Sequence, residues 1–284
     1  MAERLADIVA KITNVRQLEA VVTAMRGIAA SRAQQARSLL AGIEAYSDVV
    51  AQAMGEALAL LPEGEAMRPV VSRQSRGLIL FCAEQGFAGA FSDRVLDAAA
   101  QDLEGADVFV LGTRGAAIAG ERGIGLAWSA PMATQTGAVT TIANRVADAL
   151  YAAVADGRMT DVDILFPFFA PASGMQITRR SLLPLDLARF KQPIANLPPL
   201  TTLAPRALVE SLAAEYVFAQ LCDAAMHAFA AENEARMMAM AAAKTNIQTK
   251  LSELSRRERQ LRQEEITTEI IELAAGAEAL ANRR

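Results

Sequence analysis

Two glycine-containing stretches are the places where this sequence could bind a phosphate group. EQGFAGAF (84–91) follows an apolar run and precedes a helical stretch, and GTRGAAIAG (112–120) follows a second apolar run. A glycine turn that leads from a strand into a helix directs backbone N–H groups towards an anion. Neither stretch has the spacing GxGxxG, however, and no GK[ST] motif occurs in the chain. We therefore expect ordinary glycine turns at both places rather than a nucleotide site.

The residues that would carry acid–base, thiol or metal chemistry are few. His227 is the only histidine, which excludes a histidine-based metal cluster and disfavours acid–base catalysis. Cys82 and Cys222 lie far apart without a CxxC motif, so we expect two buried thiols in a reducing compartment rather than a disulfide or a zinc site. The sequence therefore predicts neither a catalytic group nor a cofactor nor a metal.

A basic cluster near the C-terminus has two interpretations of equal weight. It alternates with acidic side chains and comprises Arg256, Arg257, Arg259 and Arg262 among Glu258, Glu264 and Glu265. Such alternation is typical of an exposed helix face with internal salt bridges. The same side chains could form an ionic contact with a partner protein. The net charge of −4 gives no indication of nucleic-acid binding.

The composition predicts long helices in a protein that reaches membranes only through partners. Hydrophobic residues make up 52% of the chain but aromatic residues only 5%, so alanine and aliphatic side chains dominate, as in long helices. The N-terminal stretch MAERLADIVAKITNVRQ lacks the apolar core of a secretion signal. No apolar run approaches the roughly 20 residues of a membrane span.

Long proline-free helices are expected at both ends of the chain. In residues 1–60, apolar side chains recur at steps of three and four, at Leu5, Ile8, Ile12, Val15, Leu18, Val22, Met25 and Ala29. In residues 206–284 the apolar side chains follow steps of seven, at Met240, Ile247, Leu254 and Leu261, with Met237 and Leu251 on the same side. A sustained heptad predicts a left-handed coiled coil.

The middle of the chain, residues 72–195, alternates between strand and helix patterns. Strands are expected at 76–84, 106–112, 161–171 and 173–185, with helical stretches at 91–103 and 136–157, and a proline-rich breaker zone follows at Pro193, Pro198, Pro199 and Pro205. This alternation predicts a Rossmann-like α/β domain with a mostly parallel sheet.

The whole chain is therefore expected to be α/β, with a long antiparallel coiled coil of the N- and C-terminal helices and a central Rossmann-like domain. Antiparallel pairing is the simplest way to bury both apolar stripes. The C-terminal helix is the longer of the two, so residues 266–284 should extend beyond the pair. This tip has exposed apolar side chains and needs a partner, because such patches mark interfaces.

The terminal segments resemble the γ subunits of F-type ATP synthases, the central rotor shaft. ITNVRQLEAVVTAMRGIAASR (12–32) is similar to the family pattern in which AM is followed by VAAS and a basic residue. LRQEEITTEIIELAAGAEAL (261–280) resembles the more specific family pattern ARQxxITxELxEIxxGAxAL. About 55 residues carry the resemblance in detail, and its order along the chain agrees with the expected helix–domain–helix organisation.

The resemblance implies a non-catalytic rotor at the cytoplasmic face of a bacterial inner membrane. The coiled coil would stand in a ring of α and β subunits, and the α/β domain would contact the ε subunit and the membrane rotor ring of c subunits. The implied contact and coupling residues are Met25, Arg26, Arg32, Arg236, Arg262, Gln263, Ile266, Thr267, Glu269 and Glu272. Core packing is an equally good interpretation of Met25.

The sequence departs from the family pattern at two places, and two other functions stay open. CAEQGFAG (82–89) replaces the family's serine–aspartate–arginine turn, and Thr201 and Thr202 stand where the family has tyrosine and glutamate at the ring contact. One alternative is a small Rossmann-like nucleotide-binding enzyme with helical arms. The other is a coiled-coil scaffold or adaptor that associates with itself.

Overall fold

The structure, a computed structural model, describes residues 5–62, 75–170, 172–190 and 199–281. It divides into two compact units. The first, here called the coiled-coil unit, comprises Met1–Ile28 and Met237–Arg284, and the second, the α/β unit, comprises Ala29–Arg236. Two long helices, α1 (Leu5–Leu58) and α5 (Pro205–Ala281), contribute to both units. Among the described residues, no helix is both long and apolar enough to cross a membrane.

The coiled-coil unit is held together by an apolar seam between α1 and α5. Val22 of α1 packs with Met240 and Ile247 of α5, and Val15, Met25 and Leu251 cover this cluster. Gln248 donates a hydrogen bond to Glu19 Oε1 at 3.2 Å, which pairs the helices at the surface of the seam. The heptad predicted in α5 is confirmed, with Met240 and Ile247 buried and Leu254 and Leu261 half-buried.

The predicted stripe of α1 is wrong at one position. Leu18 is 51% exposed, and the neighbouring Glu19 faces the seam instead. The buried and half-buried positions Ile8, Val15, Val22 and Ala29 follow a strict step of seven. A helix in a coiled coil keeps a period of 3.5 residues, so a stripe traced with steps of three and four can slip by one residue.

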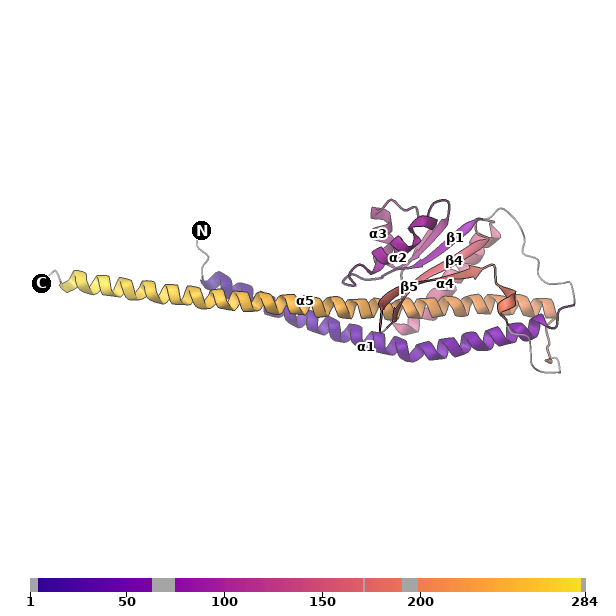
Figure 1. Ribbon diagram of the computed structural model, residues 1–284, viewed down its shortest axis with the longest axis horizontal. Coiled ribbons are helices and arrows are strands. Elements are labelled where there is room, and N and C mark those ends of the chain that lie inside the picture. The colour runs from indigo at the N-terminus through magenta and orange to yellow at the C-terminus, as the bar shows by residue number, and fades with distance from the viewer. Residues whose placement is uncertain (1–4, 63–74, 171, 191–198, 282–284) are drawn as a thin grey trace. The chain divides into compact units, whose positions relative to one another are not determined.

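The C-terminal part of α5 extends beyond the described start of α1 (Figure 1). Every side chain from Arg262 to Ala275 is exposed, whereas Leu261 still lies half-buried in the seam. The expected unpaired tip is therefore confirmed for residues 266–275. The side chains of residues 276–284 lie outside the described part of the chain.

The α/β unit is built on a five-stranded sheet in the order β3-β2-β1-β4-β5. β1, β2, β3 and β4 run parallel to one another, and β5 pairs antiparallel with β4. The elements between α1 and α5 are β1 (Arg76–Phe81), α2 (Phe91–Ala99), β2 (Asp107–Leu111), α3 (Thr113–Glu121), β3 (Trp128–Ala130), α4 (Val139–Ala155), β4 (Asp161–Ala170) and β5 (Gly174–Leu183). The predicted parallel α/β fold is confirmed.

Helices cover both faces of the sheet (Figure 1). On one face, Ile79, Phe109 and Ile164 pack against α4 and against the stretch of α5 from Val217 to Ala230. On the other face, side chains of β1 and β2 pack against α2 and α3. The alternation of side chains along β1 and β2 supplies both cores, because these strands are apolar on both faces.

Two elements were missed in the sequence. GTRGAAIAG (112–120) forms most of α3 rather than a turn, because only Gly112 has the left-handed backbone of a turn, with φ of 107°. Gly115 lies inside the helix, where the side chain of Cys82 occupies the space that a Cβ atom would need. The short strand β3 pairs with β2 through only three residues. The breakers Pro193 and Pro198 lie outside the described residues.

Candidate partner-binding site

The carboxyl edge of the sheet is where a parallel α/β fold binds nucleotides, and here a carboxylate of the chain itself fills it. Glu84 follows β1, and its Oε2 accepts hydrogen bonds from the backbone N–H groups of Thr113 and Met132 at 2.9 and 2.7 Å. Its Oε1 accepts from Thr113 Oγ1 at 2.8 Å. The N-terminus of α3 thus already binds an anion, in the way that a helix N-terminus would bind a phosphate.

The helix α5 closes the rest of this edge. Ala231 and Ala235 of α5 pack against Ala83, directly before the glycine turn, against Ala88 within it, and against Phe169 at the end of β4. The strand order reverses between β1 and β4, which is the crevice that a dinucleotide occupies in related topologies. In this chain α5 side chains occupy the crevice, so the arrangement favours a structural role of the domain over a nucleotide site.

A buried ion pair fastens the glycine turn to α5. Glu232 and Arg236 form a salt bridge, and their side chains are only 4% and 7% exposed. Glu232 accepts hydrogen bonds from the backbone N–H groups of Glu84 and Gln85 at 3.2 and 3.3 Å. Arg236 donates to the carbonyl oxygens of Gln85 and Gly86, both at 3.3 Å. Burial raises the pKa of Glu232, and the Arg236 guanidinium opposes that rise.

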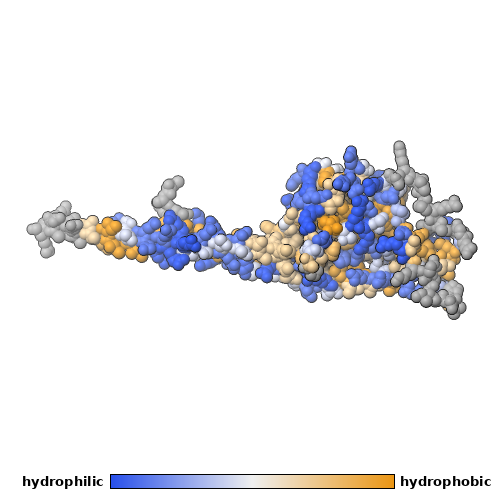
Figure 2. Space-filling model, viewed as in Figure 1, coloured by the Kyte–Doolittle hydropathy of each residue, from blue (hydrophilic) through white to orange (hydrophobic). Residues whose placement is uncertain are grey.

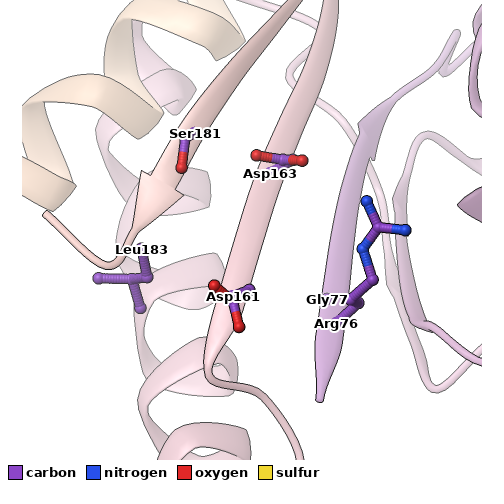
Figure 3. Close-up of a pocket in the computed structure, with 6 residues that line it drawn as sticks. All are labelled: Arg76, Gly77, Asp161, Asp163, Ser181 and Leu183. Carbon is purple, nitrogen blue, oxygen red and sulfur yellow. The ribbon is translucent and has the colours of Figure 1, made fainter. Parts of the chain in front are cut away.

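A polar hollow of about 480 Å³ lies on β1, β4 and β5 (Figure 3). Asp163 within it is paired with Arg179 at 2.6 Å, and Arg76 is paired with Asp102 at 3.2 Å. Asp161 accepts a hydrogen bond from Thr160 Oγ1 at 3.1 Å. The charged groups of this hollow thus have partners inside the chain. Among the described residues, no group of three or more histidine, cysteine or acidic side chains could hold a metal ion.

Of the residues singled out for thiol and acid–base chemistry, the two cysteines are buried and His227 is half-buried. Both cysteines are free and buried, as predicted, and burial raises the pKa of each thiol to about 12. His227 lies in the interior-facing part of α5, stacked on Phe166 and 3.4 Å from Asp223. These surroundings favour packing roles for all three side chains.

The candidate contact residues of α1 differ in exposure. Met25 is half-buried beside Val22, Met240 and Ile247, so it packs in the seam of the coiled-coil unit. Arg26 is exposed in the same unit. Arg32 belongs to the α/β unit and is half-buried. Of these three residues, Arg26 is therefore the exposed one.

The candidate residues of the tip lie together on exposed helix. Ile266, Ile270, Ile271 and Leu273 are between 51% and 75% exposed. Figure 2 shows a hydrophobic patch near the described end of α5, next to a strongly hydrophilic stretch. Of these four, only Ile266 is one of the candidate residues predicted from the sequence. The other candidates of this segment, all exposed, are Arg262, Gln263, Thr267, Glu269 and Glu272.

The side-chain hydrogen bonds described at the tip lie within α5. Arg262 pairs with Glu258 at 2.8 Å, and Thr267 Oγ1 donates to the Gln263 carbonyl oxygen at 2.8 Å. These are ordinary helical i,i+4 interactions, which leave the apolar side chains free to contact another protein. The tip is therefore the described surface best suited to a partner.

The structure does not gather all candidate residues at one place. Met25, Arg26 and the tip residues belong to the coiled-coil unit, whereas Arg32 and Arg236 belong to the α/β unit. Sequence reasoning missed the roles of Glu84 and Glu232. The position of Glu84 directly after an apolar strand and before a glycine was the only local signal, and Glu232 is 148 residues away from the backbone that it binds.

Comparison with known proteins places the whole chain in one family. The family model described as ATP synthase matches residues 4–280. The ATP synthase gamma chain of Bdellovibrio bacteriovorus is 24% identical, over 97% of this chain and 98% of that protein. The gamma chain of Acidothermus cellulolyticus is 27% identical, over 95% of each chain.

Solved structures show the same fold at lower sequence identity. A chain of the mitochondrial ATP synthase of Euglena gracilis, in an assembly of OSCP, F1 and c-ring, superposes with a TM-score of 0.69 over 97% of this chain and 94% of that chain. A chain of the rotor of the same enzyme gives a TM-score of 0.66, over 92% and 98%. Both are 12% identical to this chain.

Proposed function

Since this chain belongs to the ATP synthase family, as a divergent gamma chain and central-stalk subunit of the F-type enzyme, we propose that it is the shaft that couples rotation of a membrane ring to catalysis. The coiled-coil unit stands inside a ring of α and β subunits. Rotation of the shaft drives the β subunits, which carry the catalytic sites, through their conformational states. ATP hydrolysis drives the same rotation in reverse.

The exposed tip is the single observation that carries this proposal. Its isoleucine and leucine side chains are left uncovered on a helix that has no seam partner from Arg262 to Ala275 in the described chain. Exposed apolar side chains of this kind mark an interface. A sleeve formed by α and β subunits would cover them on all sides, and a tip without long interlocking side chains would still turn within it.

The proposed contacts follow the position of each residue. Arg262, Gln263, Ile266, Thr267, Glu269 and Glu272 contact the α and β subunits around the tip. Met25 and Arg26 lie on the shaft below it, where Met25 supports the seam and Arg26 faces a β subunit. Arg32 and Arg236 act closer to the α/β unit, and Arg236 does so from inside the fold.

The α/β unit is the base of the shaft in this proposal. It binds the ε subunit and the c-ring, which is the only route by which the chain reaches the membrane. The protein is then peripheral, at the cytoplasmic face of a bacterial inner membrane. The Glu84 carboxylate already occupies the N-terminus of α3, so the α/β unit needs no nucleotide to complete its fold. This suits a unit that serves as a docking surface for other subunits.

Co-expression with the α and β subunits of the same ATP synthase tests the proposal. We expect one complex on size exclusion that contains a single copy of this chain, and an ATPase activity that is lost when the chain is left out. Elution of the chain alone or as an elongated dimer, with an ATPase activity that is the same without it, would favour the coiled-coil scaffold as the function. Binding of a nucleotide by the chain itself would favour the enzyme.

A further inference from the structure

A small hollow of the α/β unit, here called the β5 cavity, lies between the end of β5, the turn that follows β5, and α5. Its volume is about 150 Å³, well below the roughly 300–1,000 Å³ of pockets that hold larger organic ligands. The polar residues of its lining are Arg180, Ser181, Asp186, Arg189, Tyr216 and Gln220. The cavity is therefore too small for a nucleotide, but its size and its polar groups suit a small ion.

Arg180 contributes a guanidinium group that is held in place and still has donors to spare. Its Nη1 donates to Gln220 Oε1 at 2.6 Å and to Asp223 Oδ2 at 2.8 Å. The group also lies over the ring of Phe166, with 4.9 Å between Cζ and the ring centroid. A guanidinium has five N–H donors, and the hydrogen bonds of this side chain to described residues all start from Nη1. The donors on Nε and Nη2 are therefore available to a ligand.

Arg189 brings a second positive charge to the same cavity. It belongs to the short turn Leu187–Arg189, whose backbone is fixed because Asp186 accepts a hydrogen bond from the N–H group of Ala188 at 3.1 Å. Arg189 is exposed and forms no ion pair with a residue that the structure describes. Since the lining holds two arginines and one aspartate, it favours a negatively charged ligand.

Two hydroxyl groups add neutral donors to the lining. Those of Ser181 and Tyr216 have no hydrogen-bond partner within the described part of the chain. The ring of Tyr216 packs edge-on against Phe190 with 5.0 Å between the ring centroids, and Phe190 is buried in an apolar cluster with Met54 and Val209. The wall of the cavity is thus part of the core, which holds these donors in place before a ligand arrives.

We propose that the β5 cavity binds a small tetrahedral oxyanion of the phosphate class. Arginine binds phosphate oxygens through pairs of parallel hydrogen bonds, and the two hydroxyl groups donate to the remaining oxygens. A carboxylate shares this chemistry but has only two oxygens, whereas four donor groups line the cavity. The bound anion ties the turn after β5 to Tyr216 of α5. This site lies within the α/β unit and needs no partner protein, so it does not rest on the proposed function.

Calorimetric titration of the full chain with inorganic phosphate, at constant ionic strength, tests the proposal. Acetate is the probe for a carboxylate, which a partner protein would supply. The variants are R189Q, Y216F and the control R145Q. Arg145 is a matched control because it is also an exposed arginine of the α/β unit, on α4, and does not line the cavity.

We expect the wild type to bind one phosphate per chain and to bind acetate at least about tenfold more weakly. R189Q should weaken phosphate binding by about tenfold or more, because a charged donor is lost. Y216F keeps the ring and should weaken binding by about two- to tenfold through the lost hydroxyl. R145Q should bind phosphate as the wild type does.

The thermal midpoint provides a second readout. Phosphate ions stabilise folded proteins in general, so the informative quantity is the difference between wild type and R189Q at the same phosphate concentration. We expect phosphate to raise the midpoint more in the wild type, because a ligand that binds only the folded state stabilises it. Equal rises in both proteins would contradict a specific site.

Three results of the titration would overturn the proposal. The first is the absence of saturable phosphate binding in the wild type. The second is an equal weakening in R189Q and R145Q, which would be a general effect of charge, and since Arg189 is exposed this comparison does not depend on a fragile variant. The third is acetate binding as tight as that of phosphate, which would make a carboxylate of a partner protein the occupant.

Discussion

At the scale of single residues, the approach of Cys82 to α3 sets a strict limit on side-chain size. A Cβ atom added to Gly115 would lie 2.0 Å from the Cβ atom of Cys82, whereas one added to Gly120 of the same helix would meet nothing within 4 Å. We expect G115A to destabilise the protein by about 1–3 kcal/mol through overpacking. G120A should instead stabilise α3 by about 0.5–1 kcal/mol, because alanine favours helix. Chemical denaturation of both variants checks this, and equal effects would contradict the packing assigned to α3.

The two cysteines are predicted to be inert in the folded protein. Burial raises the pKa of each thiol to about 12, so at pH 8 only about one molecule in ten thousand carries a thiolate at either site. A maleimide reagent at pH 8 should therefore modify neither Cys82 nor Cys222 until denaturant is added. Rapid labelling of one native thiol, measured by mass spectrometry, would show that its surroundings open in solution.

At the scale of elements, the contribution of an aliphatic side chain to stability depends on whether it lies inside or outside the seam between α1 and α5. Ile247 is 8% exposed in the seam, whereas Leu18 lies outside it. We expect I247A to lower the free energy of unfolding by about 2 kcal/mol or more. L18A should change it by less than about 0.5 kcal/mol. Thermal unfolding followed by circular dichroism distinguishes them, and a larger effect of L18A would contradict the observed seam.

The tip of α5 is predicted to be dispensable for folding and necessary for assembly. Removal of residues 266–284 takes away the exposed positions 266–275 and no seam residue among the described side chains, so the thermal midpoint should stay within a few degrees of the wild type. A longer deletion that begins at Leu251 removes part of the seam and should lower the midpoint clearly. A truncated chain that no longer folds would mean that the tip packs within the chain.

The elements differ in how far the sequence alone could predict them. The heptad of α5 is visible because a period of seven at Met240, Ile247, Leu254 and Leu261 is a local property. The expected stripe of α1 contained Leu18 instead of Glu19 because the periods of a straight and a supercoiled helix differ only slightly. Helix α3 was missed because Gly112, Gly115 and Gly120 suggest a turn. The side chain that requires a glycine at position 115 belongs to Cys82, which directly follows β1 and is not a sequence neighbour of α3.

The functional residues likewise divide into those that the sequence alone could predict and those that depend on packing between distant segments. The tip could be predicted as exposed because its partner helix is shorter, which is a matter of counting residues. The inward direction of Arg236 could not be predicted, since its partners Gln85 and Gly86 are 150 residues away and are brought together only by the packing of α5 on the sheet.

At the scale of the whole molecule, the features agree on a mechanical rather than a catalytic task. The crevice that could bind a nucleotide is filled by Glu84 and by alanines of α5. The long helices bury one seam and leave an apolar tip uncovered, which calls for a surrounding partner. Both features follow if the chain transmits torque between other subunits and leaves the chemistry to them.

Rotation of the chain inside an immobilised ring of α and β subunits tests this central claim most directly. An A117C variant provides a single reactive thiol on an exposed position of α3, because both native cysteines are buried. A bead attached there should turn in one direction when ATP is added and stop when ATP is removed. A ring that hydrolyses ATP at the same rate while the bead stays still would contradict the account, because this chain would then be bound to the ring without being its shaft.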